Sequence, residues 1–185
     1  MTDSGNITEA QIPVVADEAT IIADAYRGGM RMLAAGVCLI TASRNNEYGG
    51  MIATAVTSVS AEPPTLLACV NRSASMFEMI QQTGSFCVNV LTKDAVSLVE
   101  TFSSSARRAE RFQSGDWTTS ANGSPVCGEA LVSFECRLAK IVDWHTHGIF
   151  LGEVTGVIHP RPDATPLLYM DRQFHQLSEM MAPNL

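Results

Sequence analysis

The chain has 185 residues, of which 46% are hydrophobic and 17% charged, and 12 Lys and Arg against 19 Asp and Glu give a net charge of −7. This composition excludes a disordered or collagen-like chain, and an acidic chain with scattered arginines is a poor binder of nucleic acid. The charged fraction is low against the roughly 25% of an average soluble domain. We therefore expect part of the surface to face a partner subunit or an apolar ligand.

The length predicts one domain, over residues 23–180, preceded by a flexible leader of residues 1–22 that is polar and has no clear period. The first predicted element is a helix from Asp24, a residue type that commonly caps a helix. Its apolar side chains recur at helical spacing, and Gly36 has the residue type that commonly ends a helix.

Short apolar runs rich in β-branched residues predict strands over residues 37–43, 51–60, 65–70 and 85–91. Residues 44–50 contain Asn-Asn and Gly-Gly pairs and predict a hairpin connection. Ser75 to Glu78 matches a capping box and predicts a helix that ends at Gly84, and Thr92 could cap another helix.

The last third of the chain shows strand alternation. Apolar side chains from Val132 to Leu138 alternate with polar ones, and the alternation breaks at Lys140, which predicts a bulge or a bend. Further strands are expected over residues 149–158, 167–170 and 174–177, whereas residues 103–128 are irregular with one helical turn. Because strands and helices do not alternate regularly, the order favours a mainly β, antiparallel barrel with peripheral α-helices.

Four segments could carry chemistry, and no Rossmann, P-loop, zinc-protease or nucleophile-elbow motif accompanies them. The first is the strand from Met51 to Ser60, where small side chains would let a flat ring approach the backbone and hydroxyls could reach a ribityl chain or phosphate. The second runs from Cys69 to Ser75 and could hold a phosphate at a helix N-terminus. The alternatives are a strand with one solvated face and a well-capped helix.

The third segment is the turn with His145 and His147, which could titrate near neutrality, bind a nucleotide or ligate a metal, or be a plain surface turn. The fourth, from Tyr169 to His175, could line a pocket or form a solvated hairpin. An arginine cluster at positions 107, 108 and 111 is read as a solvated helix face, with a second phosphate contact as the alternative.

Export and membrane signals are missing, because the first basic residue is Arg27 and no segment approaches the roughly 20 apolar residues of a spanning helix. The five cysteines form no C-x-x-C pair and lie mostly in apolar runs. This usage predicts a cytoplasmic protein with small buried thiols, no metal site and no membrane contact.

Taken together and in this order, these segments resemble the short flavin reductases, the reductase components of two-component flavin monooxygenases. The chain is most similar to the 4-hydroxyphenylacetate 3-monooxygenase reductases and the pyrimidine-utilisation flavin reductases. The resemblance spans Asp24 to Leu177. The stretches that carry it are AAGV at 34–37, ATAVTSVS at 53–60, PPTLL at 63–67, CVNRSAS at 69–75, FCVNVL at 86–91, ALVSFEC at 130–136 and DRQFH at 171–175.

The resemblance implies an FMN-binding split β-barrel with Greek-key strand order, usually a homodimer with flavin near the subunit interface. It also implies an NAD(P)H:flavin oxidoreductase that uses NADH or NADPH to reduce FMN or FAD. Reduced flavin then passes to a separate oxygenase. Because the cofactors carry the hydride transfer, the protein needs to orient two rings rather than supply an acid or a nucleophile.

Residue by residue, the resemblance implies four sets of contacts. The flavin ring and ribityl chain would meet Ala53, Thr54, Ala55, Val56, Thr57 and Ser58, and the phosphate end would meet Asn71, Arg72, Ser73 and Ser75. Cys69, Phe102, Tyr169 and Arg172 complete the expected cofactor-binding set. His147 matches the histidine of a Gly-x-His turn and is the expected catalytic residue, which meets the nicotinamide nucleotide; His145 stands where that glycine usually lies.

Two other classes of function are compatible with the same barrel. A non-catalytic flavin- or haem-binding protein would hold its chromophore tightly without turnover, with His175 or Tyr169 as a candidate haem ligand. A structural dimer would bind neither.

Overall fold

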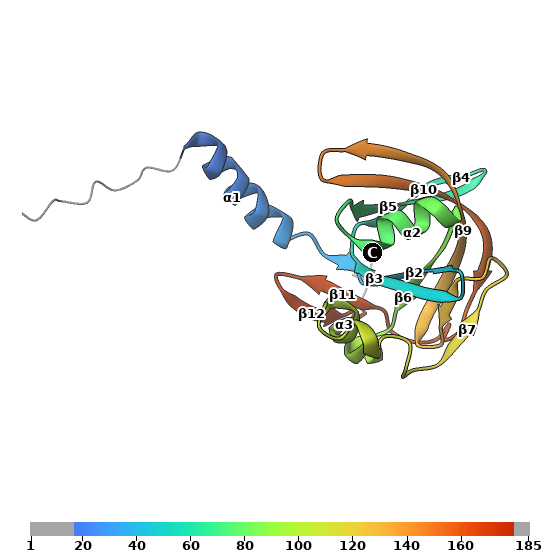
Figure 1. Cartoon of the computed structure of the whole chain (residues 1–185). Helices are drawn as coiled ribbons and strands as arrows, with labels where there is room; N and C mark the ends of the chain where they lie inside the picture. Colours follow the sequence, from blue (N-terminus) through green and yellow to red (C-terminus); the bar gives the residue numbers. More distant parts are fainter. Residues whose placement is uncertain (1–16, 180–185) are drawn as a thin grey trace, which may run out of the picture. The chain divides into compact units, whose positions relative to one another are not determined.

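The computed structural model describes residues 17–179 (Figure 1). The chain divides into two compact units between Leu33 and Ala34. The first contains helix α1 (Glu18–Arg31), whose N-cap Asp17 accepts a hydrogen bond from the backbone N–H of Thr20 at 2.7 Å. The predicted start at Asp24 is therefore wrong, because Asp17 already satisfies an N–H of the first turn while Asp24 pairs with Arg27 inside the helix.

The new start of α1 also bears on the expected leader. Residues 18–22 are helical, and residues 1–16 lie outside the described part of the chain. Gly36 does not end the helix, which closes at Met32, and instead belongs to strand β1 (Ala35–Gly36) of the second unit. No helix among the described residues is both long and apolar enough to cross a membrane.

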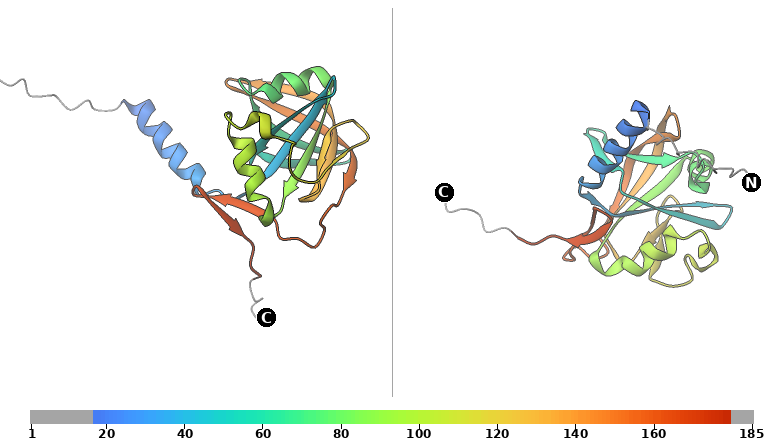
Figure 2. Two further views of the ribbon diagram at one scale, coloured as in Figure 1. Left: turned by 60° about the horizontal axis from the view of Figure 1, so that its bottom comes forward. Right: turned by 90° about the vertical axis from the view of Figure 1, so that its left-hand side faces the viewer.

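The second unit is built on a seven-stranded antiparallel sheet with the order β3-β2-β6-β9-β10-β5-β4. Its strands wrap around a common interior (Figure 2). Their bounds are β2 (Cys38–Arg44), β3 (Glu47–Ala53), β4 (Val56–Ala61), β5 (Pro64–Asn71), β6 (Ser85–Leu91), β9 (Ala130–Trp144) and β10 (His147–Ile158).

The expected strand over residues 51–60 is two strands. β3 ends at Ala53 and β4 begins at Val56, and these consecutive strands lie at opposite ends of the sheet order. Thr54 and Ala55 connect them, and the carbonyl of Ala55 accepts a hydrogen bond from the N–H of Cys69 at 3.0 Å. The prediction missed the break because small and hydroxyl residues run through it without a Gly or Pro.

Two small sheets complete the unit. β1, β11 (Leu167–Met170) and β12 (Gln173–Gln176) form one, and β7 (Trp117–Thr119) and β8 (Pro125–Cys127) form the other. The expected strand at 167–170 is confirmed. The β7–β8 pair was not expected, because three-residue strands in a polar segment show no alternation.

Four helical segments lie between the strands: α2 (Ser75–Thr83), η1 (Lys93–Ala95), α3 (Val96–Ser103) and η2 (Arg108–Glu110). The predicted capping box is wrong: the N-cap of α2 is Ala74, which has no side-chain acceptor, and Ser75 is the first helical residue. Gly84 does end α2, with φ +65. Thr92 occupies the N-cap position of η1, but its side chain makes no capping hydrogen bond, because its hydroxyl donates to the carbonyl of Glu129 at 3.0 Å.

The bulge predicted at Lys140 is confirmed. Lys140 pairs with Leu151, whereas the next pair along joins Leu138 to Gly152, so Ala139 is the additional residue.

Strand alternation also separates the two cores. Cys38, Ile40 and Ala42 face one core, and Leu39 faces the other.

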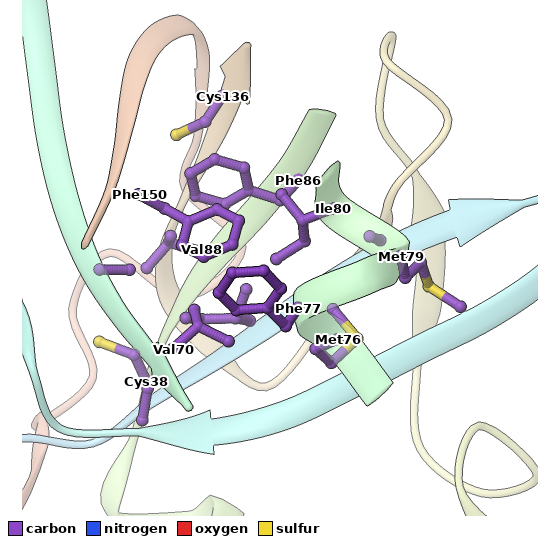
Figure 3. Close-up of a cluster of buried hydrophobic side chains, with 14 of the residues drawn as sticks. Cys38, Val70, Met76, Phe77, Met79, Ile80, Phe86, Val88, Cys136 and Phe150 are labelled. Atoms are coloured by element: carbon purple, nitrogen blue, oxygen red, sulfur yellow. The ribbon is translucent and has the colours of Figure 1, made fainter. Parts of the chain in front are cut away.

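The first core lies inside the curled sheet and is closed by α2, which contributes Met76, Phe77, Met79 and Ile80 (Figure 3). There the rings of Phe77 and Phe150 meet edge to face with centroids 5.0 Å apart. The second core lies beneath α3, where Leu98, Val99 and Phe102 cover the other face of β2.

Candidate functional site

Three strand ends converge where β5 finishes and the β9–β10 hairpin turns. Asn71 is the cross-strand partner of His147, and His147 is in turn the partner of Trp144. The backbone N–H of Arg72 donates to the carbonyl of Thr146 at 2.9 Å. The structure thus brings the expected catalytic histidine beside the start of the expected phosphate segment.

Arg72 is already engaged at this junction. Its guanidinium donates to the carboxylate of Asp143 at 2.6 Å and lies over the ring of Phe77, 5.4 Å from the centroid. The side-chain oxygen of Asn71 accepts from both the backbone and the hydroxyl of Ser73, at 2.9 and 2.8 Å. This Asx turn directs the chain into α2.

The turn that carries His147 depends on an unusual backbone. His145 adopts φ +47, in the left-handed region that glycine enters most easily. Its ring packs edge to face on Trp144 with centroids 5.1 Å apart, and the Thr146 hydroxyl lies 2.9 Å from Nδ1 of His147. The turn therefore forms with histidine in the left-handed region at the position where the resemblance implies glycine, and it leaves His147 exposed.

The expected flavin strand borders two different cavities. Thr54 lines a cavity of about 220 Å³, here called the Thr54 pocket. The other residues around the Thr54 pocket are Val37, Ile52, Val99, Ser103, Tyr169 and Phe174. Val56, Thr57 and Ser58 line a second, apolar cavity of about 470 Å³, together with Cys38, Val88, Phe134 and Val154 among others.

Tyr169 and Phe174 are cross-strand partners on β11 and β12, and their ring centroids lie 5.6 Å apart. The structure thus brings Tyr169 together with Thr54. Arg172 is different, because it occupies the β11–β12 turn with φ +63, is exposed, and lines neither of these cavities.

Phe102 and Cys69, two of the expected cofactor contacts, pack beside the cavities and do not line them. Phe102 is only 3% exposed and packs on Phe112 and Trp117. A Cβ added at Gly50 would lie 2.5 Å from the ring of Phe102, so Phe102 packs directly against the backbone of β3 from the second core. Cys69 is half-buried in β5 and is tied through its backbone to the Ala55 connection.

A third cavity, of about 100 Å³, was not expected, and we call it the arginine pocket. It is lined by Tyr48, Gly49, Gly50, Ser75, Arg108, Arg111 and Phe112. Ser75 faces this pocket, whereas Arg72 pairs with Asp143 near His147, so the expected phosphate segment is divided between two places.

Arg111 corrects the expectation of a solvated helix face. Its guanidinium donates to the carbonyls of Gly50, Phe102 and Ser104 at 3.0, 2.7 and 3.2 Å. Partial burial, and next the charge of Arg108, lower the pKa of Arg111. The arginine cluster was visible in the sequence. Only the tertiary contacts show that Arg111 is partly buried while Arg108 is exposed.

The buried thiols of Cys38, Cys127 and Cys136 do not contribute nucleophiles to these cavities. Burial raises the pKa of Cys38 to about 12, of Cys127 to about 11 and of Cys136 to about 12. Thiols with such values stay protonated and unreactive near neutral pH. Within residues 17–179, no group of three or more His, Cys, Asp or Glu is placed to hold a metal ion.

The family follows from a match to the flavin reductase like domain, which covers residues 30–178. The chain belongs to this family. It is 41% identical over 160 residues to the protein named FMN reductase (NADH) RutF of Stutzerimonas stutzeri strain A1501, a match that covers 86% of this chain and 91% of that protein.

Solved structures agree with this assignment. The flavin reductase PheA2 has a TM-score of 0.76 and 31% identity, over 84% of this chain and 98% of that one. BorF, the flavin reductase component of a bacterial two-component tryptophan halogenase, has a TM-score of 0.77 and 30% identity, over 85% of this chain and 99% of that one. The expected fold class, an antiparallel split β-barrel with peripheral helices, is confirmed.

Proposed function

We propose that this protein is an NADH:flavin oxidoreductase that reduces FMN and supplies the reduced flavin to a separate oxygenase. The observation that carries the proposal is the pairing of His147 with Asn71 beside Arg72, in a family fold shared with reductase components. The choice of FMN and NADH over FAD and NADPH rests on the 41% identity to a protein named FMN reductase (NADH).

The flavin ring is assigned to the Thr54 pocket and to the backbone of Ala53 to Ser58. Support comes from its apolar lining, from the aromatic rings of Tyr169 and Phe174, and from the exposed connection at Thr54 and Ala55. An apolar wall suits the faces of an isoalloxazine, and backbone amides of an open connection suit its polar edge. The residues present therefore fit a flavin.

The chemistry that the bound flavin supplies is acceptance of a hydride at N5 from C4 of the nicotinamide. The chain's own contribution is to hold the two rings at contact distance, an orientation effect that can be worth about 7–11 kcal/mol. His147 is exposed beside Arg72 and can bind the nicotinamide nucleotide at the open side of the site. Amide donors near the pyrimidine edge would stabilise negative charge on the reduced ring.

We also propose a homodimer in the cytoplasm. Large apolar side chains are exposed on the second unit, including Val59 at 50%, Val157 at 49% and Phe174 at 41%. Such exposure and the low charged fraction favour a covered face. The five cysteines are free, which is what a reducing compartment favours.

The test is NADH oxidation by the purified protein, followed by absorbance, with and without added FMN. We expect oxidation that depends on both FMN and enzyme. A rate no faster than the enzyme-free mixture of NADH and FMN would overturn the proposal. A tightly held chromophore without turnover would favour a binding protein, and absence of flavin uptake in equilibrium dialysis would favour a structural dimer.

A further inference from the structure

Trp144 is the most exposed large hydrophobic side chain of the described residues, at 67%. It is the last residue of β9, and His145 and Thr146 form the two-residue turn that leads to His147 at the start of β10. An indole buries a large flat area when a ligand covers it, and such rings are common in binding sites. The exposed indole beside the expected nucleotide histidine is therefore a candidate contact for a ligand.

Strand register places Trp144, His147 and Asn71 side by side. Trp144 is the cross-strand partner of His147, and His147 is the partner of Asn71 on β5. Cross-strand partners in an antiparallel sheet project to the same face, with about 5 Å between neighbouring strands. Val70 and Phe150 project to the opposite face and belong to the first core. The three side chains therefore form one row on the face of the sheet that is turned away from that core.

A second row on the same face continues toward the assigned flavin ring. It consists of Val142, Ile149 and Cys69, which are paired across the same three strands. The N–H of Cys69 donates to the carbonyl of Ala55 at 3.0 Å, so this row ends at the β3–β4 connection to which the flavin ring is assigned. Three strand spacings from Val142 to Ala55 amount to about 14 Å. One continuous sheet face thus joins the Trp144 end to the flavin end.

The charges near this face suit a ligand that carries phosphate. None of the six residues in the two rows is acidic. Asp143 precedes Trp144 but is paired with Gly148, so it projects to the opposite face, where its carboxylate accepts from Arg72 at 2.6 Å. Arg72 offsets the charge of Asp143 there. The exposed imidazole of His147 is then the group of the first row that can contact a phosphate or a ribose.

The turn holds the indole in a defined place. Of its two central residues, His145 alone has a positive φ, at +47, which is the pattern of a type II′ hairpin turn with glycine as the usual first residue. Histidine adds a ring that glycine lacks, and this ring packs edge to face on Trp144 with centroids 5.1 Å apart. The contact restricts the rotamers of Trp144, so less side-chain entropy is lost when a ligand binds.

We propose that Trp144 stacks on the adenine ring of NADH, with His145 as the positioning residue that holds the indole in place. The nicotinamide half lies toward Ala55 and the assigned flavin ring, and His147 contacts the dinucleotide between its two rings. Stacking on a base requires a flat and exposed aromatic ring, which the hairpin offers at Trp144. This inference rests on the proposed function for the identity of NADH as the ligand.

The first experiment compares NADH with reduced nicotinamide mononucleotide, which has the reacting ring but no adenine. Trp144→Ala should lower kcat/KM for NADH about tenfold, mainly through KM, and should change kcat/KM for the mononucleotide less than twofold. Trp144→Phe keeps a flat ring and should recover most of the efficiency with NADH. Tyr26→Ala is the matched control, because it removes an aromatic side chain of similar exposure, 65%, from α1, and it should affect neither substrate.

The same kinetics test the role of His145. His145→Gly keeps the residue type that suits the turn but removes the ring on Trp144, so it should raise KM for NADH about threefold and leave the mononucleotide unchanged. An unchanged KM for NADH would overturn the positioning role of His145. In Trp144→Ala, an equal loss for NADH and the mononucleotide, or no loss for NADH, would overturn the adenine contact.

The second experiment uses AMP as the probe and does not depend on turnover. The chain has two tryptophans, and Trp117 is half-buried and packs on Phe102 and Phe112. AMP should quench the tryptophan fluorescence of the wild type to saturation, and this quenching should vanish in Trp144→Phe, which retains Trp117. Ribose 5-phosphate has no base and should not quench. Equal quenching by ribose 5-phosphate, or quenching by AMP that persists in Trp144→Phe, would contradict stacking.

The two proposals fail in different ways. If AMP quenches Trp144 but the protein does not oxidise NADH with FMN, the proposed function fails while the adenine site stands. If FMN-dependent oxidation of NADH is present but AMP does not quench, the adenine site alone is overturned. If Trp144→Ala converts a dimer to a monomer in sedimentation and shows no selective loss with NADH, the indole belongs to an interface between two copies and the adenine site is again overturned.

Discussion

Asn71, the last residue of β5, lies directly across from His147, the first residue of β10. The backbone of the adjacent Arg72 is bonded to Thr146 at 2.9 Å. These contacts couple the loop that leads into α2 to the hairpin that carries the histidine. We therefore expect a change in the β9–β10 turn to shift the entrance of α2 through this backbone pairing.

His147→Ala is expected to lower kcat/KM for NADH by about tenfold, the loss of one charge-assisted hydrogen bond to the nucleotide. The affinity for FMN should stay within twofold, because His147 lies with Arg72 and Asp143 rather than in the Thr54 or arginine pockets. Steady-state kinetics and fluorescence titration measure the two quantities. An equal fall in FMN affinity would place His147 in the flavin site.

Arg72→Ala should raise KM for NADH several-fold and leave the preference for FMN over riboflavin unchanged. The reason is that its guanidinium is turned to Asp143 at 2.6 Å, beside the histidine hairpin. Steady-state kinetics and fluorescence titrations with FMN and with riboflavin serve as the measurement. A selective loss of FMN would instead assign Arg72 to the flavin phosphate, as the sequence pattern predicts.

His145→Val should lower the free energy of unfolding by about 1–2 kcal/mol, because a β-branched residue is strained in the left-handed region. His145 has φ +47 at this position. Urea denaturation measures the change. His145→Gly is the matched control and should not destabilise to the same degree; equal destabilisation by both variants would point to the Trp144 contact rather than the backbone.

Gly50→Ala should destabilise the protein by about 1–3 kcal/mol through overpacking. The added Cβ would lie 2.5 Å from the ring of Phe102 and 3.2 Å from that of Phe112. Gly36→Ala offers a control, since a Cβ there meets nothing within 4 Å. Thermal melts that show the same shift for both variants would contradict the packing of α3 on β3.

Stability should fall as pH rises above 9, the ordinary thiol pKa in the unfolded chain. Burial raises the pKa of Cys38 and Cys136 to about 12 and of Cys127 to about 11, so the folded state retains protons that the unfolded state loses. Each such thiol contributes a slope of about 1.4 kcal/mol per pH unit in this window. Urea melts from pH 8 to 10.5 measure the slope, and Cys127→Ala should reduce it by one thiol; an unchanged slope would contradict the burial of Cys127.

Local sequence was enough for features that depend on neighbours in the chain. The alternation from Val132 to Leu138 and its break at Lys140 predicted β9 and its bulge correctly, because strand periodicity and its interruption are local properties. The order of several short motifs identified the family, and Gly84 ended α2 as expected for a residue with no Cβ.

Only the tertiary structure decided which residues share a cavity. It divides residues 51–60 between two edge strands, β3 and β4. It places Ser75 in the same cavity as Arg108 and pairs Arg72 with Asp143. It also packs the ring of Phe102 against Gly50. The physical reason is that a side chain's charge and burial depend on partners far away in sequence, which periodicity cannot reveal. The low charged fraction predicts a surface that meets a partner subunit or an apolar ligand, and the folded chain shows which large apolar side chains are exposed.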